Sequence, residues 1–152
     1  MSESTNENSA GADPGVRVMV LDPDGRGAVL MLPRESDGGV GTGLRAVLEC
    51  RWFDVVRCSD RLDMWIDDEG LIVGDPVMNE VATRIASFYG LSWQKYAGRV
   101  VFASNTTEGA TVGLSDGQVA ALTTSITEWG GAVVSAALHP AYSAAAGSGA
   151  AS

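Results

Sequence analysis

The segment from Leu62 to Asp67 alternates along the chain as a half-buried strand does. One set of alternating positions is Leu62, Met64 and Ile66, and the other is Asp63, Trp65 and Asp67. A period of two is typical of a strand that buries only one of its faces. The acidic turn Asp68-Glu69-Gly70 follows, and then the apolar run Leu71-Ile72-Val73. The pattern predicts a β-hairpin with Trp65 on the outer face of the sheet, where a large aromatic side chain indicates a contact surface.

Four further segments have the composition of strands, because they are rich in β-branched and apolar residues and are bounded by turn residues. They are Val16 to Asp22, Ala28 to Leu32, Phe53 to Cys58 and Val100 to Ala103. The turn Pro23-Asp24-Gly25 predicts that the first two form a hairpin.

Capping residues mark the starts of two helices. Asn79 can cap a helix with Glu80 in its first turn, and Ser115 with Gln118 forms a capping-box pattern. Gly90 and the pair Gly130-Gly131 are expected to end these helices. The predicted core-facing residues are Val81, Ile85, Phe88 and Tyr89 in the first helix, and Val119, Leu122, Ile126 and Trp129 in the second.

A third helix is predicted from about Gly43 to Arg51, with Thr42 as its N-cap. The glycine-rich segment before it lacks the Lys-Ser or Lys-Thr pair of a phosphate-binding loop, so a connection between a strand and a helix is favoured. The N-terminus of that helix would still be a generic anion site.

These elements predict an α+β fold, with a small, mostly antiparallel sheet of five to six short strands packed by about three helices. Residues 1–15 have almost no apolar content and predict a disordered N-terminal tail. Residues 16–130 form the predicted single domain. Residues 131–152 are rich in Ala, Gly and Ser and predict a flexible C-terminal tail.

Composition narrows the possible functions. The chain has 152 residues, of which 45% are hydrophobic, which suits one globular domain. It has neither an apolar run of the roughly 20 residues that span a membrane nor the layout of a secretory signal, so we expect a cytoplasmic protein. A net charge of −9 makes direct binding to nucleic acid unfavourable, because phosphates are also negative.

The reactive side chains give little support to an enzyme. The only histidine, His139, lies in the predicted C-terminal tail, so no ordered histidine accompanies a Ser, Thr or Cys nucleophile. Cys50 and Cys58 lack the paired spacing of a zinc site, and we expect both to be buried reduced thiols. We therefore predict neither catalytic residues nor a cofactor.

Carboxylates are concentrated around the predicted acidic hairpin. Their spacing is not that of a calcium loop, and Asp67-Asp68-Glu69-Gly70 has the composition of a β-turn, so a solvated acidic turn is favoured over a metal site. Two alternatives stay open. One is a small metal-dependent enzyme that uses Asp63, Asp67 and Glu69, and the other is an acidic mimic of nucleic acid that blocks a DNA-binding protein.

Three segments resemble domain of unknown function family 3846. They are Asp63 to Thr83, Gly98 to Phe102 and Val112 to Val119, and the resemblance covers roughly residues 16–124. Members of that family are associated with phages, prophages, plasmids and actinobacteria. The strong excess of Arg over Lys fits the GC-rich genomes of such hosts. The resemblance implies no reaction, cofactor or catalytic residue.

The expected function is that of a non-enzymatic binding or accessory protein of a phage or mobile element. Its expected partner is a host macromolecule or a small ligand in the host cytoplasm, with no membrane involved. The residues expected to bind are Asp63, Trp65, Asp67, Asp68, Glu69 and Asn79.

Overall fold

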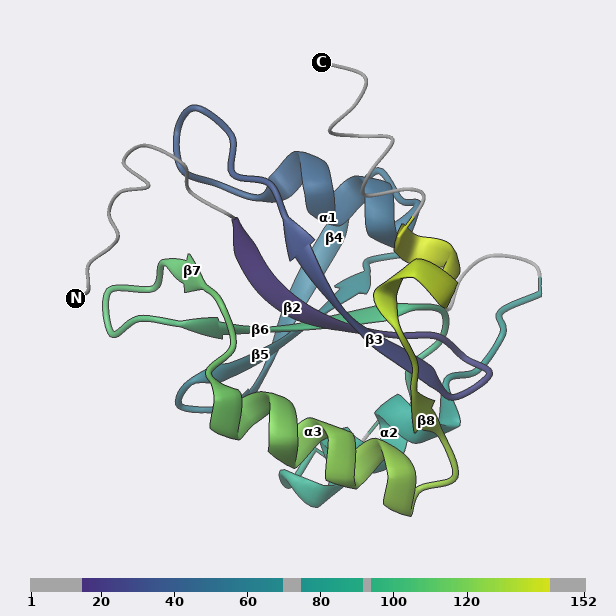
Figure 1. Ribbon diagram of the computed structural model, residues 1–152. Helices are drawn as coiled ribbons and strands as arrows, with labels where there is room; N and C mark the ends of the chain where they lie inside the picture. Colours follow the sequence, from purple (N-terminus) through teal and green to yellow (C-terminus); the bar gives the residue numbers. More distant parts are fainter. Residues whose placement is uncertain (1–14, 70–74, 92–93, 143–152) are drawn as a thin grey trace.

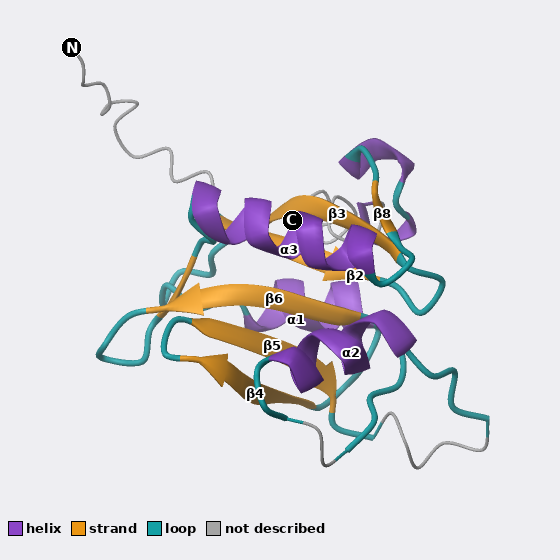
Figure 2. Cartoon of the chain, turned by 90° about the horizontal axis from the view of Figure 1, so that it is seen from below, coloured by secondary structure: helices purple, strands orange, loops and turns teal. Residues whose placement is uncertain are grey.

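Helices cover both faces of one β-sheet in the computed structural model, which describes residues 15–69, 75–91 and 94–142 (Figure 1). Helix α1 (Gly41–Leu48) packs on one face, whereas α2 (Glu80–Phe88) and α3 (Asp116–Glu128) pack on the other. Figure 2 shows α2 and α3 in front of the strands and α1 behind them. The strands are β2 (Val16–Leu21), β3 (Arg26–Leu32), β4 (Phe53–Ser59), β5 (Leu62–Asp67), β6 (Val100–Asn105), β7 (Thr111–Val112) and β8 (Ala132–Val133).

The strands follow the order β4-β5-β6-β2-β3-β8, and β7 pairs with β6. All pairs are antiparallel except β3 with β8. The predicted α+β class is confirmed, although the sheet has seven strands in the described part of the chain, against the five to six predicted. The hairpin of β2 and β3 is also confirmed. The predicted strand Leu71-Ile72-Val73 lies outside the described residues.

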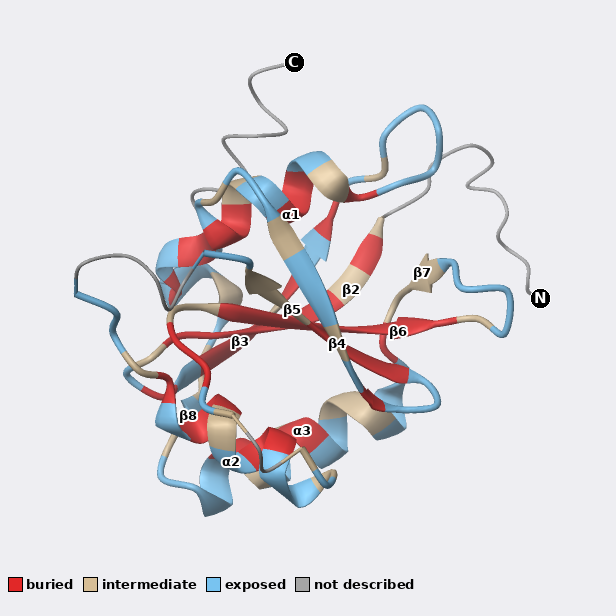
Figure 3. Ribbon diagram, turned by 180° about the vertical axis from the view of Figure 1, so that it is seen from behind, coloured by how far each residue is buried: buried red, intermediate tan, exposed pale blue. Residues whose placement is uncertain are grey.

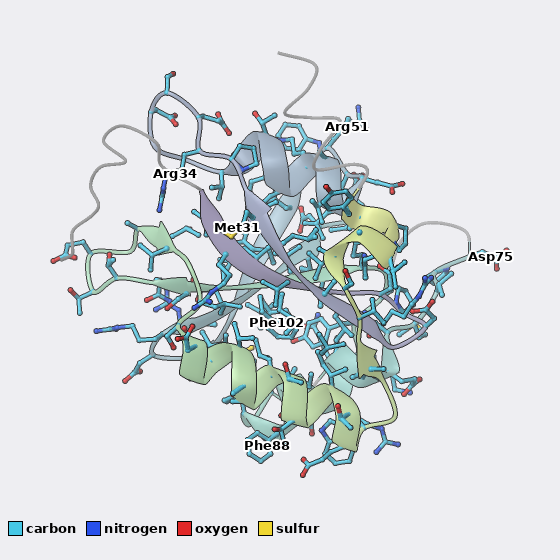
Figure 4. The ribbon with its side chains drawn as sticks, viewed as in Figure 1. Met31, Arg34, Arg51, Asp75, Phe88 and Phe102 are labelled. Carbon is cyan, nitrogen blue, oxygen red and sulfur yellow. The ribbon has the colours of Figure 1, made fainter. Side chains whose placement is uncertain are left out.

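The central strand β6 is buried along its whole length. Val101 and Ala103 face the cluster beneath α1, whereas Val100 and Phe102 face the cluster beneath α2 and α3. Figure 4 shows Phe102 in the middle of the domain. Because helices cover both faces, the first four residues of this strand form a continuous apolar run without alternation.

The prediction that β5 exposes its second face is wrong. Trp65 is half-buried and packs edge-to-face on Phe53, with ring centroids 5.3 Å apart. Asp63, on the same face, is buried. The alternation was misleading because Leu44, Val47 and Leu48 of α1 belong to the apolar cluster on that face.

The caps of α2 and α3 are confirmed. The Asn79 side chain accepts a hydrogen bond from the Ala82 amide, and Ser115 and Gln118 form the full capping box. Phe88 and Trp129 were predicted to face the core, and this is wrong, because their exposed fractions are 72% and 39%. Phe88 lies roughly a quarter turn from the centre of the buried face of α2, so it projects into solvent (Figure 4).

Helix α1 begins and ends differently from the prediction. Its N-cap is Val40, which makes no side-chain cap, and the helix ends at Leu48 instead of Arg51. The Thr42 amide donates to the Glu35 carboxylate at 2.6 Å. The generic anion site at this N-terminus is therefore occupied by a carboxylate of the chain itself.

The chain beyond residue 130 differs from the predicted flexible tail as far as it is described. β8 pairs in parallel with Arg26 and Gly27 of β3, and a 3-10 turn, η1 (Ala136–Leu138), follows. His139 is only 2% exposed, so its assignment to a flexible segment was wrong.

Within the described part of the chain, β4 is one edge strand of the sheet, and most of it is exposed (Figure 3). The Val55 amide makes a 2.8 Å hydrogen bond to the carboxylate of Asp54. A backbone donor of the edge strand is therefore already satisfied by a charged side chain, which is one way in which proteins protect sheet edges.

We expect Gly131→Ala to lower the free energy of unfolding by about 1–3 kcal/mol. A Cβ atom at this position would overlap the carbonyl oxygen of Gly25 and lie 2.8 Å from the Ile126 side chain. Gly117→Ala is the matched control, because its Cβ would meet only the Ser115 hydroxyl at 3.8 Å. Urea denaturation of both variants measures the difference, and equal stabilities would contradict the close packing at Gly131.

Candidate binding groove

The six residues expected to bind a ligand do not all share one surface. Asp63 is buried, and its carboxylate accepts a 2.8 Å hydrogen bond from Arg57 Nε. Its charge also contributes, after burial itself, to raising the pKa of the Cys58 thiol to about 12. Trp65 packs on Phe53. These contacts of Asp63 and Trp65 therefore stabilise the fold.

Asn79 is completely buried and has a structural role. Its Nδ2 donates to the carbonyl oxygens of Leu21 at 3.1 Å and Gly98 at 2.9 Å. Its Oδ1 accepts from the Ala82 amide at 3.0 Å. These bonds use both donors of the amide, so no donor is left for a ligand.

Asp67, Asp68 and Glu69 form the turn that their composition predicts. The carboxylate of Asp67 accepts a hydrogen bond from the Glu69 amide at 2.9 Å, and the Asp68 amide donates to the Trp52 carbonyl oxygen at 3.0 Å. Such local bonds from an aspartate side chain stabilise turns. The turn leaves Asp68 and Glu69 exposed at the end of the sheet.

A hollow of about 140 Å³ separates this turn from the segment that precedes β6. The sheet contributes Asp54, Ile66, Asp67 and Asp68, and the facing segment contributes Gln94, Lys95, Tyr96 and Ala97. The lining thus combines three carboxylates and one ammonium group with the apolar side chains of Ile66 and Ala97.

A second hollow adjoins the first, and a third adjoins the second. The second, of about 210 Å³, shares Asp67 and Ala97 with the first, and the third, of about 220 Å³, shares Leu48 and Arg99 with the second. We call the three together the acidic groove. Its charged residues are Asp22, Glu49, Asp54, Asp67, Asp68, Asp75, Lys95 and Arg99. Asp75 projects away from the body of the domain (Figure 4).

The Arg99 side chain bonds to several of the segments that line the groove. Its Nε lies 2.6 Å from Asp22 Oδ1, and its Nη1 donates to the Val47 carbonyl oxygen at 2.6 Å and lies 3.3 Å from Glu49 Oε2. The side chain is only 14% exposed. It therefore joins the end of β2, the C-terminal turn of α1 and the start of β6, and its charge is balanced by Asp22.

The remaining acidic residues of the groove have no such balance. Among the described residues, Asp54, Asp67, Asp68 and Asp75 make no ion pair. The cations of the groove lining are Lys95 and Arg99, and Arg99 is already paired with Asp22. The groove is therefore negative and favours a positively charged ligand.

Asp67 and Asp68 are the predicted binding residues that the structure brings into the groove. The groove residues Asp22, Glu49, Asp54 and Arg99 were not predicted, and they lie in or next to four other elements. Their positions in the sequence could have indicated them, because each lies at or next to the end of a strand or helix.

The described residues contain no group of three His, Cys, Asp or Glu side chains arranged to hold a metal ion. None of the helices in the described part of the chain is long and apolar enough to cross a membrane.

The fold and the groove define a small α+β domain with an acidic concave surface at one end of its sheet. The family model described as Domain of unknown function (DUF3846) matches residues 16–127, and the chain belongs to this family. This confirms the resemblance of the three sequence segments. No curated protein and no solved structure matches the chain.

We expect Arg99→Gln to lower the free energy of unfolding by roughly 3 kcal/mol, because it leaves the buried Asp22 carboxylate without its counter-charge. Arg26→Gln is the matched control, since it removes an ion pair with Asp24 in which both side chains are about half exposed. Thermal and urea denaturation should show a much smaller loss for the control. Equal losses of unfolding free energy in the two variants would mean that burial of the pair of Arg99 and Asp22 does not increase its contribution to stability.

Proposed function

We propose that this protein is a non-enzymatic binding protein, an accessory factor of a phage or mobile element that acts on a host macromolecule or small ligand in the host cytoplasm. The acidic groove is its binding surface. The observation that carries the proposal is the row of adjoining hollows in which Asp54, Asp67 and Asp68 lie without ion-pair partners. Unpaired carboxylates in a concave surface suit a ligand that supplies the missing positive charge.

The apolar residues of the lining and the length of the groove indicate what kind of ligand it suits. Leu48, Ile66, Pro76 and Val77 add apolar surface between the carboxylates, and Val77 is 64% exposed. The hollows extend from Lys95 at one end to Pro23 at the other. An extended segment of a partner protein that carries Arg or Lys beside apolar residues matches this lining better than a compact small molecule.

The origin in a mobile element rests on the association that the family resemblance implies and on the excess of Arg over Lys. Because a mobile element acts inside its host, this proposed origin leads us to expect that the partner belongs to the host cell.

No observation specifically favours the two alternatives. Asp63 and Asp67 are four residues apart on β5, so their Cα atoms are about 13 Å apart, too far for both side chains to reach one metal ion easily. Asp63 is also held by Arg57. For nucleic-acid mimicry, a DNA duplex presents its phosphates on a convex surface, whereas the unpaired carboxylates here line hollows.

We expect the double variant Asp67→Asn with Asp68→Asn to bind a hexalysine probe about threefold to tenfold more weakly than the unaltered chain, because two attractive charges of the groove are lost. Fluorescence anisotropy at 50 mM and 150 mM salt measures this affinity. Capture of host proteins from a lysate by the same variants then tests whether a natural partner uses the groove.

The control is the double variant Asp60→Asn with Glu108→Gln. It changes the net charge by the same amount, and both exposed residues lie in turns outside the groove lining. It should weaken probe binding less than twofold. If both double variants weakened probe binding equally, the net charge of the chain would explain the loss. That result would contradict the proposal that the groove binds the probe.

A metal titration separates the proposal from the enzyme alternative. We expect 5 mM Mg²⁺ or Mn²⁺ to leave the Tm within about 1 °C, because ligands that bind the folded state stabilise it and no metal is expected to do so. Differential scanning fluorimetry measures the Tm. A rise of several degrees that is lost in Asp67→Asn would favour the metal-dependent enzyme.

A further inference from the structure

The buried imidazole of His139 has a hydrogen-bond partner on each ring nitrogen. Nδ1 accepts from the Ala141 amide at 3.1 Å, and Nε2 lies 3.2 Å from the carbonyl oxygen of Arg26. A ring nitrogen that accepts a hydrogen bond carries no proton, so the neutral ring must be protonated at Nε2, which donates to Arg26. Both bonds are therefore satisfied by a single protonation state, the neutral one.

The Nδ1 bond has the geometry of a helix N-cap. A helical turn begins at Pro140, and His139 precedes it with the extended backbone angles φ −99° and ψ 135°. Pro140 then occupies the first helical position, which proline favours, and Ala141 is the second, whose amide an N-cap side chain commonly binds. The imidazole nitrogen thus does what a Ser, Asp or Asn oxygen usually does.

Protonation would remove this cap for two physical reasons. A proton on Nδ1 would face the Ala141 N–H, donor against donor, so the bond would be lost. The ring would also carry a positive charge at the positive end of the turn's dipole. Ala141 is completely buried in the cluster beneath α1, so loss of the cap acts on a packed residue.

The charges around the ring partly oppose one another. Asp22 Oδ1 is 3.8 Å from Nε2 and favours the charged ring, whereas Arg99, from the start of β6, and Arg26, from β3, disfavour it. Asp24 is bound to Arg26 at the exposed end of the hairpin. Burial is the largest influence, and it lowers the pKa of His139 below its ordinary value.

We propose that His139 is a proton-operated latch, which caps the turn at Pro140 while neutral and releases the segment from Ala132 to Tyr142 from the edge of the sheet when it is protonated. The latch requires no ligand in the acidic groove, although Asp22 and Arg99 border both the groove and the imidazole ring. The sign follows from the lowered pKa: the open segment binds the proton more readily, so closure is favoured above about pH 6.5 and is lost as the pH falls below it. The opening constant should rise by up to about tenfold per pH unit below 6.5, until the pKa of the closed form is passed.

Hydrogen exchange followed by mass spectrometry tests this in the full-length protein. Protection factors, corrected for the intrinsic exchange rate, are measured at pH 7.5 and pH 5.5 for a peptide that covers Ala132 to Tyr142. We expect up to about a tenfold loss of protection in this peptide and none in a peptide that covers β6. Unchanged protection of Ala132 to Tyr142 at pH 5.5 overturns the latch.

His139→Asn is the matched variant, because an asparagine oxygen can cap the turn and does not titrate. Its protection should be the same at both pH values after correction. An equal loss in this variant would assign the effect to another group and overturn the proposal. If the variant fails to fold, NMR of the unaltered chain decides: the Ala141 amide signal must shift with the same apparent pKa as the His139 ring, and independent titration rejects the latch.

Discussion

The buried side-chain amide of Asn79 is the interaction on which the rest of the structure depends. A polar group with no exposure destabilises the folded state unless its hydrogen bonds are made, and here they are made to three separate parts of the chain. They are the end of β2, the residue before Arg99 and the first turn of α2. The Asn79 backbone adds bonds to Tyr96 and Thr83. Asn79 therefore links α2 to the end of β2 and to the segment that forms one wall of the groove, in addition to the apolar packing of α2 on the sheet.

A second anchor, the pair of Arg99 and Asp22, lies at the same end of the sheet. A nearly buried charge requires a partner, so this pair fixes where β2, α1 and β6 meet. The two anchors together hold the groove's walls, and among the described residues Asp54, Asp67, Asp68 and Asp75 of the groove make no ion pair. The division between acids that hold the fold and acids that face solvent explains how a chain of net charge −9 can keep a localised acidic surface.

The features predicted correctly from the sequence are those that depend on neighbouring residues. The caps at Asn79 and Ser115 and the turn at Pro23-Asp24-Gly25 act over three or four positions, so their chemistry is visible in the sequence. The same holds for the acidic turn after β5.

The errors come from long-range packing. His139 binds a carbonyl group 113 residues away, and Arg99 binds Asp22 from 77 residues away. Alternation in β5 indicated one buried face, but it could not reveal that α1 covers the other. For the same reason, two of the six predicted binding residues lie in the groove, whereas Asp63 and Asn79 became parts of the core.

The protected edge of β4 limits how this domain can recognise another protein. A peptide that extended the sheet would have to displace the Asp54 carboxylate from the Val55 amide and pair with a strand that carries charged side chains. Backbone pairing is largely indifferent to sequence, so blocking it removes a general route to unintended partners. The β4 edge thereby resists unintended pairing with strands of other chains. Under the proposed function, contacts to a partner would be made by the side chains at the ends of the strands, which respond to the partner's sequence.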